Sequence, residues 1–220
     1  MTPLFKDRAE AGRILARSLK SVVPDSGALV LALPRGGVPV GFEIAKSLAA
    51  DLDVFLVRKL GVPGQEELAM GAIASGGVTV LNDPLIRHLG IQPAIIDRII
   101  ARERQEIERR EQTYREGRPP LAIKNRRIIL VDDGVATGAS MLAAMRAVRN
   151  REPKSLIAAV PVASREACEE FKQTADAVIC AETPEPFYAV GVWYQDFSQT
   201  SDAEVRDLLR RASRLRAASI

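Results

Sequence analysis

Short, uniformly apolar runs separated by helix-like stretches are the feature of this chain that most restricts its fold. Such runs predict strands at residues 28–33, 54–57, 128–131, 155–160 and 177–180, with two shorter strands at 72–74 and 78–81. The apolar spacing of other segments predicts helices at residues 4–22, 38–48, 140–148 and 165–173. Apolar strands joined by helices are typical of a parallel sheet covered on both faces. The sequence therefore predicts an α/β fold in a single domain over residues 1–220.

A long charged segment interrupts this alternation. Residues 93–120 predict a helical insertion in which glutamate and arginine recur at the spacing of ion pairs along a helix, which is typical of a solvated face. Ile100, Ile107 and Tyr114 recur every seven residues and form a narrow apolar seam. This seam would pack either on the body of the same chain or on a second subunit, and a homodimer is expected.

Composition and charge exclude several classes of protein. Of the 220 residues, 47% are hydrophobic, which is enough to bury a core. The apolar runs are too short to cross a bilayer, and charged residues stand where a signal peptide needs apolar ones, so we expect a cytoplasmic chain without membrane contact. The net charge of +3 comes from 31 basic and 28 acidic side chains that are interspersed. A nucleic-acid partner is therefore not favoured.

Histidine and cysteine are too scarce for the common catalytic and metal sites. His88 is the only histidine, which argues against a Ser/His/Asp triad and against a histidine-rich metal centre. Cys168 and Cys180 lack the spacing of a zinc or redox motif, so both are expected to be buried thiols.

Residues 128–140 (IILVDDGVATGAS) concentrate the chemistry of the chain. A buried strand leads to Asp132 and Asp133, and ligands of open α/β sheets bind at that edge. Adjacent carboxylates repel each other, and hydroxyl donors or a cation can reduce that repulsion. A ribose diol would supply the hydroxyl donors, and hydrated Mg²⁺ would supply the cation. The small residues that follow, as far as Ser140, let backbone N–H groups and a helix N-terminus close round an anion. The segment therefore predicts a site for a ribose phosphate.

The same residues closely resemble the phosphoribosyl pyrophosphate (PRPP) motif of the type I phosphoribosyltransferases. That resemblance implies a parallel-sheet fold with helices on both faces and a small hood, here the C-terminal segment at about residues 184–215. It implies that Asp132 and Asp133 bind the ribose hydroxyls, directly or through water on Mg²⁺. The substrate-binding loop would comprise Val135, Ala136, Thr137, Gly138, Ala139 and Ser140, with residues 136–140 holding the 5-phosphate.

Two further segments extend the resemblance. Arg35, Gly36 and Gly37 follow the first strand, where the family has its pyrophosphate loop. The glycines would let backbone amides approach the leaving group, and Arg35 would supply charge. Arg58 and Lys59 end the next predicted strand, where family members carry cations into a mobile loop. Residues 60–68 are expected to be that loop, without regular structure, and to close over the site as a lid.

The hood of the family corresponds to an aromatic segment near the C-terminus. Residues 187–197 hold five of the ten aromatic residues of the chain. Tyr188 is the expected base-stacking residue, and Asp196 is expected to assist the metal beside Asp132 and Asp133. Many 6-oxopurine enzymes have an acidic residue where this chain has Ala136, so the resemblance leaves the acceptor open.

The implied reaction transfers the 5-phosphoribosyl group of PRPP to a nitrogen of a base-like acceptor and releases pyrophosphate. It requires Mg²⁺ and belongs to nucleotide salvage, with Arg35, Arg58, Lys59 and the two aspartates stabilising the reacting groups. A PRPP-sensing regulator and an RNA-binding protein that uses the arginine-rich helix are the alternatives. A dinucleotide oxidoreductase is not favoured, because no G-x-G-x-x-G spacing follows the first strand. The acceptor, the subunit number and the pathway are not predicted.

Overall fold

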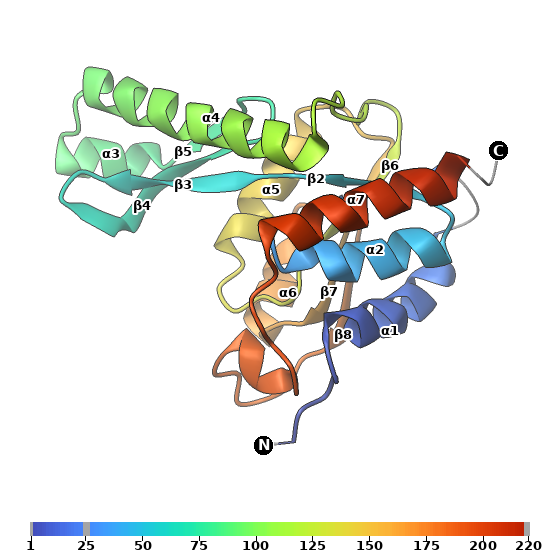
Figure 1. Cartoon of the computed structure of the whole chain (residues 1–220). Helices are drawn as coiled ribbons and strands as arrows, with labels where there is room; N and C mark the ends of the chain where they lie inside the picture. The colour runs from blue at the N-terminus through green and yellow to red at the C-terminus, as the bar shows by residue number, and fades with distance from the viewer. Residues whose placement is uncertain (1, 24–26, 218–220) are drawn as a thin grey trace.

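A five-stranded parallel sheet forms the centre of the structure (Figure 1). The computed structural model describes residues 2–23 and 27–217. The strand order is β2-β1-β6-β7-β8. The strands are β1 Leu29–Ala32, β2 Asp51–Val54, β6 Arg127–Val131, β7 Ser155–Val162 and β8 Ala177–Glu182. The predicted parallel α/β architecture is confirmed.

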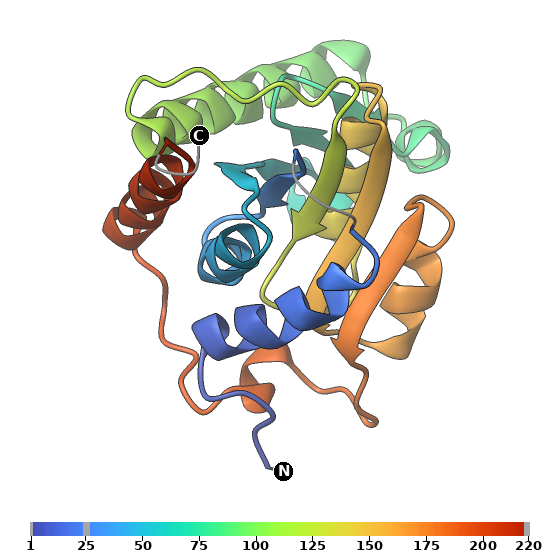
Figure 2. The same ribbon diagram turned by 90° about the vertical axis from the view of Figure 1, so that its right-hand side faces the viewer.

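Helices cover both faces of this sheet (Figure 2). One face packs against α1 Arg8–Lys20, α2 Gly37–Ser47 and α7 Asp202–Ala217. The other face packs against α5 Ala139–Arg149 and α6 Arg165–Phe171. Asp7 starts α1, because its side chain accepts a hydrogen bond from the backbone N–H of Glu10, and Ser164 caps α6 in the same way.

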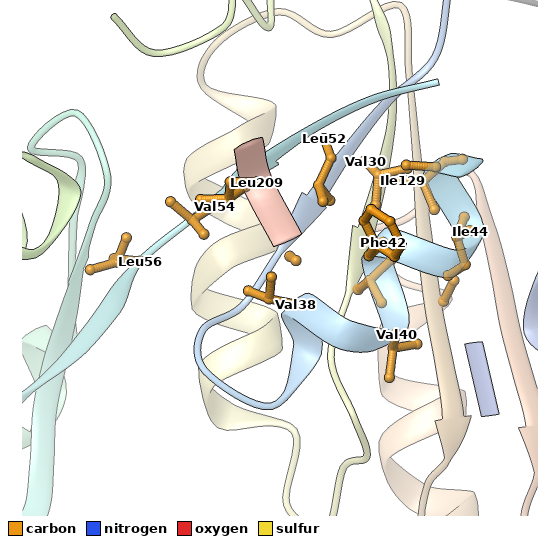
Figure 3. Packing of buried hydrophobic residues seen from close by; sticks show 14 of the residues in the cluster. Val30, Val38, Val40, Phe42, Ile44, Leu52, Val54, Leu56, Ile129 and Leu209 are labelled. Atoms are coloured by element: carbon orange, nitrogen blue, oxygen red, sulfur yellow. The ribbon is translucent and has the colours of Figure 1, made fainter. Parts of the chain in front are cut away.

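The core explains why the inner strands of the sheet are almost entirely apolar. Along β1, Val30 and Ala32 join the cluster under α2, whereas Leu29 and Leu31 join the cluster under α5. The same alternation recurs in β6 and β7. Figure 3 shows the first cluster, where Val30 and Ile129 of the sheet lie beside Phe42 of α2. Since successive side chains of a strand point to opposite faces, a strand buried on both faces is apolar throughout.

A second sheet, of three antiparallel strands, corrects two expectations. Its strands are β3 Val57–Val62, β4 Gln65–Ala74 and β5 Thr79–Leu81, and α3 Asp83–Leu89 follows. The strand predicted at 54–57 was wrong, because β2 ends at Val54 and β3 begins at Val57 in the other sheet. Residues 60–68 do not lack regular structure, since most of them belong to the β3–β4 hairpin. Gly64 takes a positive φ of 77° in its turn, so this glycine serves a tight hairpin.

The charged insertion is the 23-residue helix α4 Pro93–Arg115. Ile107 and Tyr114 of its predicted seam are buried, and the helix packs on α7 and on the β3–β4 hairpin. The seam therefore packs on the body of the same chain. Arg115 anchors the end of α4, because its guanidinium bonds the buried carboxylate of Asp53 on β2.

The two cysteines were expected to be buried thiols, and this prediction was wrong. Cys168 on α6 and Cys180 on β8 form a disulfide across 12 residues of sequence. The fold brings α6 alongside β8, a proximity that the spacing in sequence does not reveal. Among the residues that the structure describes, no helix is both long and apolar enough to span a membrane.

Candidate active site

The candidate site lies at the carboxyl ends of β1 and β6. The chain passes from β1 to β2 on one side and from β6 to β7 on the other, so a topological switch point lies between these two neighbouring strands. Ala32 pairs with Val131, so the strands end level with each other. Ligands of open α/β sheets bind in the crevice at such a point.

The turns after the two strands touch each other. Arg35, Gly36 and Gly37 follow β1, and Asp132 and Asp133 follow β6. A Cβ atom on Gly36 would lie 1.9 Å from the carboxylate oxygen Oδ2 of Asp133, and one on Gly37 would lie 3.0 Å from the Cα atom of Asp132. Glycine is therefore required at both positions for the turns to approach this closely.

The two aspartates form a charged pair whose repulsion the fold only partly relieves. The backbone N–H of Asp133 donates to Oδ1 of Asp132 at 2.9 Å. Burial raises the pKa of Asp132 well above its usual value, and the negative charge of Asp133 adds to this rise. An ionised Asp132 would thus be stabilised by a ligand that brings hydroxyl donors or a cation to it.

Arg8 partly neutralises the charge of Asp133, a contact that the sequence did not indicate. Its Nε donates to Oδ2 of Asp133 at 2.7 Å, and both side chains are largely buried, with exposures of 11% and 15%. The guanidinium also lies 3.9 Å from the ring centre of Phe197, and its Nη1 donates to the carbonyl of Ser198. Arg8 precedes Asp133 by 125 residues, and its local sequence carries no motif that indicates this role.

Tyr194 ties the C-terminal aromatic segment to the same aspartate. Its hydroxyl donates to the backbone carbonyl of Asp133, and burial raises the pKa of Tyr194, with a further contribution from the charge of Asp133. Phe5 pairs with Tyr194 through an isolated parallel bridge, so the N-terminal segment and the aromatic segment join beside the site. This aromatic segment includes the short 3₁₀ helix η1 Val190–Trp193.

The predicted substrate loop leads into the N-terminus of α5. Val135 is buried and pairs with Ala163, whereas Ala136, Thr137, Ala139 and Ser140 are exposed. Gly138 precedes α5 with a positive φ of 76°, and no side chain caps this helix. The hydroxyl of Ser164 holds the loop by donating to the carbonyl of Ala136 at 2.7 Å, a contact that the sequence did not reveal. Exposed small residues before an uncapped helix N-terminus suit the binding of an anion.

Tyr188 and the loop border one pocket, of about 750 Å³. Its lining includes Ala136, Thr137, Phe187 and Tyr188, and Tyr188 is 66% exposed. The predicted stacking residue thus shares a cavity with the predicted phosphate loop. Asp196 is exposed, accepts a hydrogen bond from the backbone N–H of Ser198, and has its pKa lowered by that bond.

Arg58 and Lys59 were predicted to end a strand, but they lie within β3. The two side chains differ in their surroundings. Arg58 donates to Glu103 of α4, a buried carboxylate that also accepts from Arg102. Burial acts to raise the pKa of Glu103, but the bonds from Arg58 and Arg102 lower it overall. Lys59 is exposed and borders a pocket of about 430 Å³ with Ala139 and Ser140, as well as the pocket beside Arg58.

The residues present fit a divalent cation that is shared with a ligand. Within the described ranges, no group of three or more His, Cys, Asp or Glu side chains could hold a metal. Mg²⁺ is usually bound by one or two carboxylates together with water and substrate phosphates. Asp132 and Asp133 are such a pair, and their mutual repulsion would favour a cation. Asp196 does not form a three-carboxylate group with them.

Comparisons with known proteins show the family to which this chain is similar. The family model for a phosphoribosyl transferase domain matches residues 6–195. Two Mycobacterium tuberculosis proteins, from strains CDC 1551 and H37Rv and named provisionally as phosphoribosyl transferases, are each 46% identical over 211 residues. The match covers 96% of this chain and 47% of each relative, so the chain spans about half their length.

Solved structures show the same fold. A crystal structure from Thermus thermophilus superposes with a TM-score of 0.84 at 43% identity, over 94% of this chain and 98% of that one. A structure from Aquifex aeolicus, with a TM-score of 0.50 and 10% identity, covers 92% of this chain and 82% of its own and shares the fold alone. With the family model matching most of its length, this chain belongs to the phosphoribosyl transferase domain family.

Proposed function

We propose that this protein transfers the 5-phosphoribosyl group of PRPP to a nitrogen of a base-like acceptor and releases pyrophosphate. Family membership supports phosphoribosyl transfer in general. The observation that carries the finer proposal is the contact of the Arg35–Gly37 turn with Asp132 and Asp133. A pyrophosphate held at the first turn and a ribose diol held at the aspartates would be as close as they are in one PRPP molecule.

Each part of the site has a role in this proposal. Asp132 and Asp133 accept the ribose hydroxyls, and the loop from Val135 to Ser140 binds the 5-phosphate at the N-terminus of α5. The backbone amide of Gly36 faces the pyrophosphate, whereas that of Gly37 donates to the carbonyl of Leu33 and lets the turn pass close to Asp132. Tyr188 stacks on the acceptor. When bound, Mg²⁺ would neutralise charge on the pyrophosphate, with Asp132 and Asp133 holding it and Asp196 assisting through water.

Transfer in this proposal needs no covalent intermediate on the protein. The C1–O bond to pyrophosphate breaks as positive charge develops on the ribose ring, and an acceptor nitrogen takes C1. The carboxylates of Asp132 and Asp133 stabilise the ring, while Arg35 and Lys59 stabilise the leaving group. The β3–β4 hairpin is proposed to act as the lid that excludes water during this step. A homodimer and a cytoplasmic location, both expected from the sequence, remain part of the proposal.

Titration calorimetry with PRPP tests the binding part of this function. One PRPP should bind per chain, and the affinity should be at least tenfold higher with Mg²⁺ than with excess chelator, because the metal relieves charge at the aspartates. Ribose 5-phosphate serves as the control ligand, since it keeps the diol and the 5-phosphate but lacks pyrophosphate. Absence of PRPP binding under both conditions would refute the assignment of the site.

The different surroundings of Arg58 and Lys59 give a matched pair of variants. Lys59→Ala should lower turnover on the order of tenfold or more with little change in stability, because an exposed cation beside the loop is lost. Arg58→Ala should instead lower the free energy of unfolding by about 1–3 kcal/mol, because buried Glu103 loses a charged hydrogen-bond partner. Steady-state kinetics and urea denaturation of both variants separate the two effects. Equal loss of turnover in both would contradict this division of roles.

The observations do not favour RNA binding by α4. Several of its arginines are engaged by glutamates of the same helix: Arg109 and Arg110 both bond Glu106, and Arg102 bonds Glu103. These hydrogen bonds also lower the pKa of Glu106 to about 2, so it stays ionised beside its arginines.

A further inference from the structure

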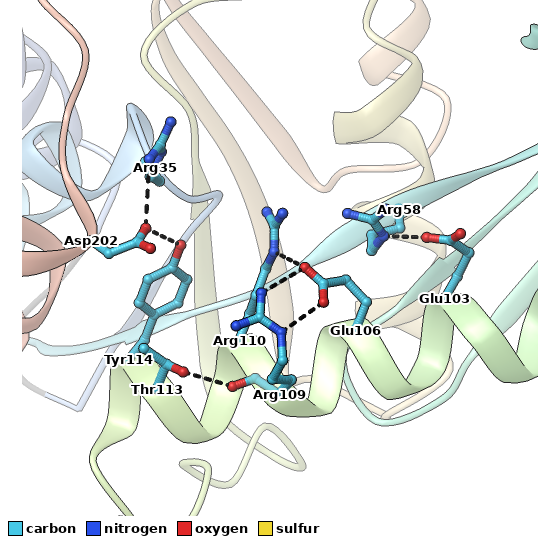
Figure 4. Close-up of polar contacts among 9 residues, drawn as sticks. All are labelled: Arg35, Arg58, Glu103, Glu106, Arg109, Arg110, Thr113, Tyr114 and Asp202. Atoms are coloured by element: carbon cyan, nitrogen blue, oxygen red, sulfur yellow. Dashed lines mark hydrogen bonds and ion pairs between the residues drawn. The ribbon is translucent and has the colours of Figure 1, made fainter.

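A short chain of polar contacts links α4 to Arg35 in the turn after β1 (Figure 4). The hydroxyl of Tyr114, near the end of α4, donates to Oδ1 of Asp202 at 2.9 Å. The same carboxylate oxygen lies 3.6 Å from Nη1 of Arg35. Tyr114, Asp202 and Arg35 are far apart in sequence but lie together in the fold. Arg35 belongs to the turn that contacts the two aspartates of the site.

Tyr114 is fixed in a way that suits it to orient its partner. The residue is 2% exposed, and its ring belongs to the core cluster under α2 and α7. Burial, and then the bond to Asp202, raise the pKa of Tyr114 to about 12, so the phenol remains protonated and can act as a donor at neutral pH. Asp202 is the first residue of α7, where a carboxylate also interacts favourably with the helix dipole.

The contact between Asp202 and Arg35 is too exposed to contribute much to folding. The two side chains are 55% and 35% exposed, and an ion pair this exposed adds little to the stability of a protein. At 3.6 Å the carboxylate lies near Nη1, one of the three nitrogens of a guanidinium that has five N–H donors. The arrangement therefore restricts where Arg35 lies without fully neutralising it.

We infer that Asp202 and Tyr114 are positioning residues that hold Arg35 in place for an incoming pyrophosphate group. This inference rests on the proposed function and adds to it a task for α4 and for the start of α7. A free arginine side chain samples many rotamers, so its charge is often away from the leaving group when the C1–O bond breaks. Tyr114 holds Asp202, and Asp202 holds Arg35, so the charge is already in place in the transition state.

If Tyr114 acts through Asp202, and Asp202 acts through Arg35, the kinetics of variants should show a distinctive pattern. Tyr114→Phe removes only the buried hydroxyl, and Asp202→Ala removes the carboxylate. Each should lower kcat about three- to fivefold, as suits an exposed ion pair, while the KM for PRPP changes little, because misplaced charge is felt most in the transition state. The double variant should be no worse than the poorer single one. In an Arg35→Ala background neither change should have a further effect.

Two control variants match these changes in chemistry and place. Asp207→Ala removes another exposed carboxylate of α7, which pairs with Arg210 and Arg211 of the same helix. Thr113→Val removes the hydroxyl next to Tyr114 on α4, which donates to the carbonyl of Arg109. Both should keep the turnover of the unaltered protein. Circular dichroism and urea denaturation check that all variants fold.

Measured together, these variants separate failure of the inference from failure of the proposed function. Calorimetric binding of inorganic pyrophosphate with Mg²⁺ is recorded beside turnover for the unaltered protein, Arg35→Ala, Tyr114→Phe and Asp202→Ala. If Arg35→Ala impairs turnover while Tyr114→Phe and Asp202→Ala match the unaltered protein, the positioning role is wrong and the function stands. Additive losses in the Arg35→Ala background would also overturn it. If the unaltered protein neither turns over PRPP nor binds pyrophosphate, both ideas fall.

Discussion

Replacing Arg115 with alanine should lower the free energy of unfolding by about 3–5 kcal/mol, the usual cost of breaking a buried ion pair from one side. Its side chain and that of Asp53 are 8% and 7% exposed. Nε of Arg115 donates to both carboxylate oxygens of Asp53, at 2.9 and 3.1 Å, and Nη2 donates to the carbonyl of Val54. Without the guanidinium, a buried aspartate at the edge of the sheet loses its cation.

Urea denaturation of Arg115→Ala measures this effect, and the same helix offers a control. Arg109 also pairs with a carboxylate, that of Glu106, but its side chain is 65% exposed. Arg109→Ala should therefore leave the midpoint of urea denaturation close to that of the unaltered protein. Replacing Arg115 and Asp53 together with apolar residues of similar size should recover part of the loss, because neither charge of this pair is then left buried without the other. Equal, small losses in Arg115→Ala and Arg109→Ala would show that α4 is not anchored through Asp53.

Changing Asp132 and Asp133 together to asparagine should weaken PRPP binding by about 10²–10⁴-fold. Hydrogen bonds to charged groups contribute about 1.5–3 kcal/mol each, and the double variant replaces two charged acceptors by neutral amides. It also removes the charges that would hold Mg²⁺. Asparagine keeps the shape of the turn, so the adjoining glycines should still pack against it.

Calorimetry with PRPP and Mg²⁺ measures this loss, with Asp207→Asn as a control for removing a carboxylate elsewhere. Circular dichroism should show the same fold in the double variant. The Mg²⁺ dependence of any residual binding should also vanish, which separates loss of the site from general weakening. A double variant that binds PRPP as tightly as the unaltered protein does would place the ribose elsewhere.

The sequence predicted the central sheet because burial on both faces leaves a direct mark on composition. Strands β1, β6 and β7 are apolar at successive positions, since each position meets one of two helical layers. The loop from Asp132 to Ser140 was also readable, because its acids, small residues and helix start are contiguous. Local chemistry of this kind needs no knowledge of distant contacts.

Most of the features that were missed depend on contacts between residues that are distant in sequence. Arg8 reaches Asp133 across 125 residues, and Asp202 reaches Arg35 only because α7 returns beside α2. The disulfide forms because α6 lies alongside β8. The β3–β4 hairpin was taken for an irregular loop because its glycines and proline suggest breaks, whereas Gly64 serves the turn and Gly61 permits close approach of the opposite strand.

Release of pyrophosphate from PRPP that depends on an acceptor tests phosphoribosyl transfer by this chain most directly. The protein is incubated with PRPP, Mg²⁺ and a panel of purine, pyrimidine and pyridine acceptors, and products are identified by mass spectrometry. We expect pyrophosphate release to depend on one acceptor of the panel and to equal the amount of product in which a nitrogen of that acceptor is bonded to ribose 5-phosphate. Both should be lost in the Asp132→Asn, Asp133→Asn double variant. Tight PRPP binding with no acceptor-dependent pyrophosphate across the panel would contradict the claim and indicate a PRPP-sensing regulator.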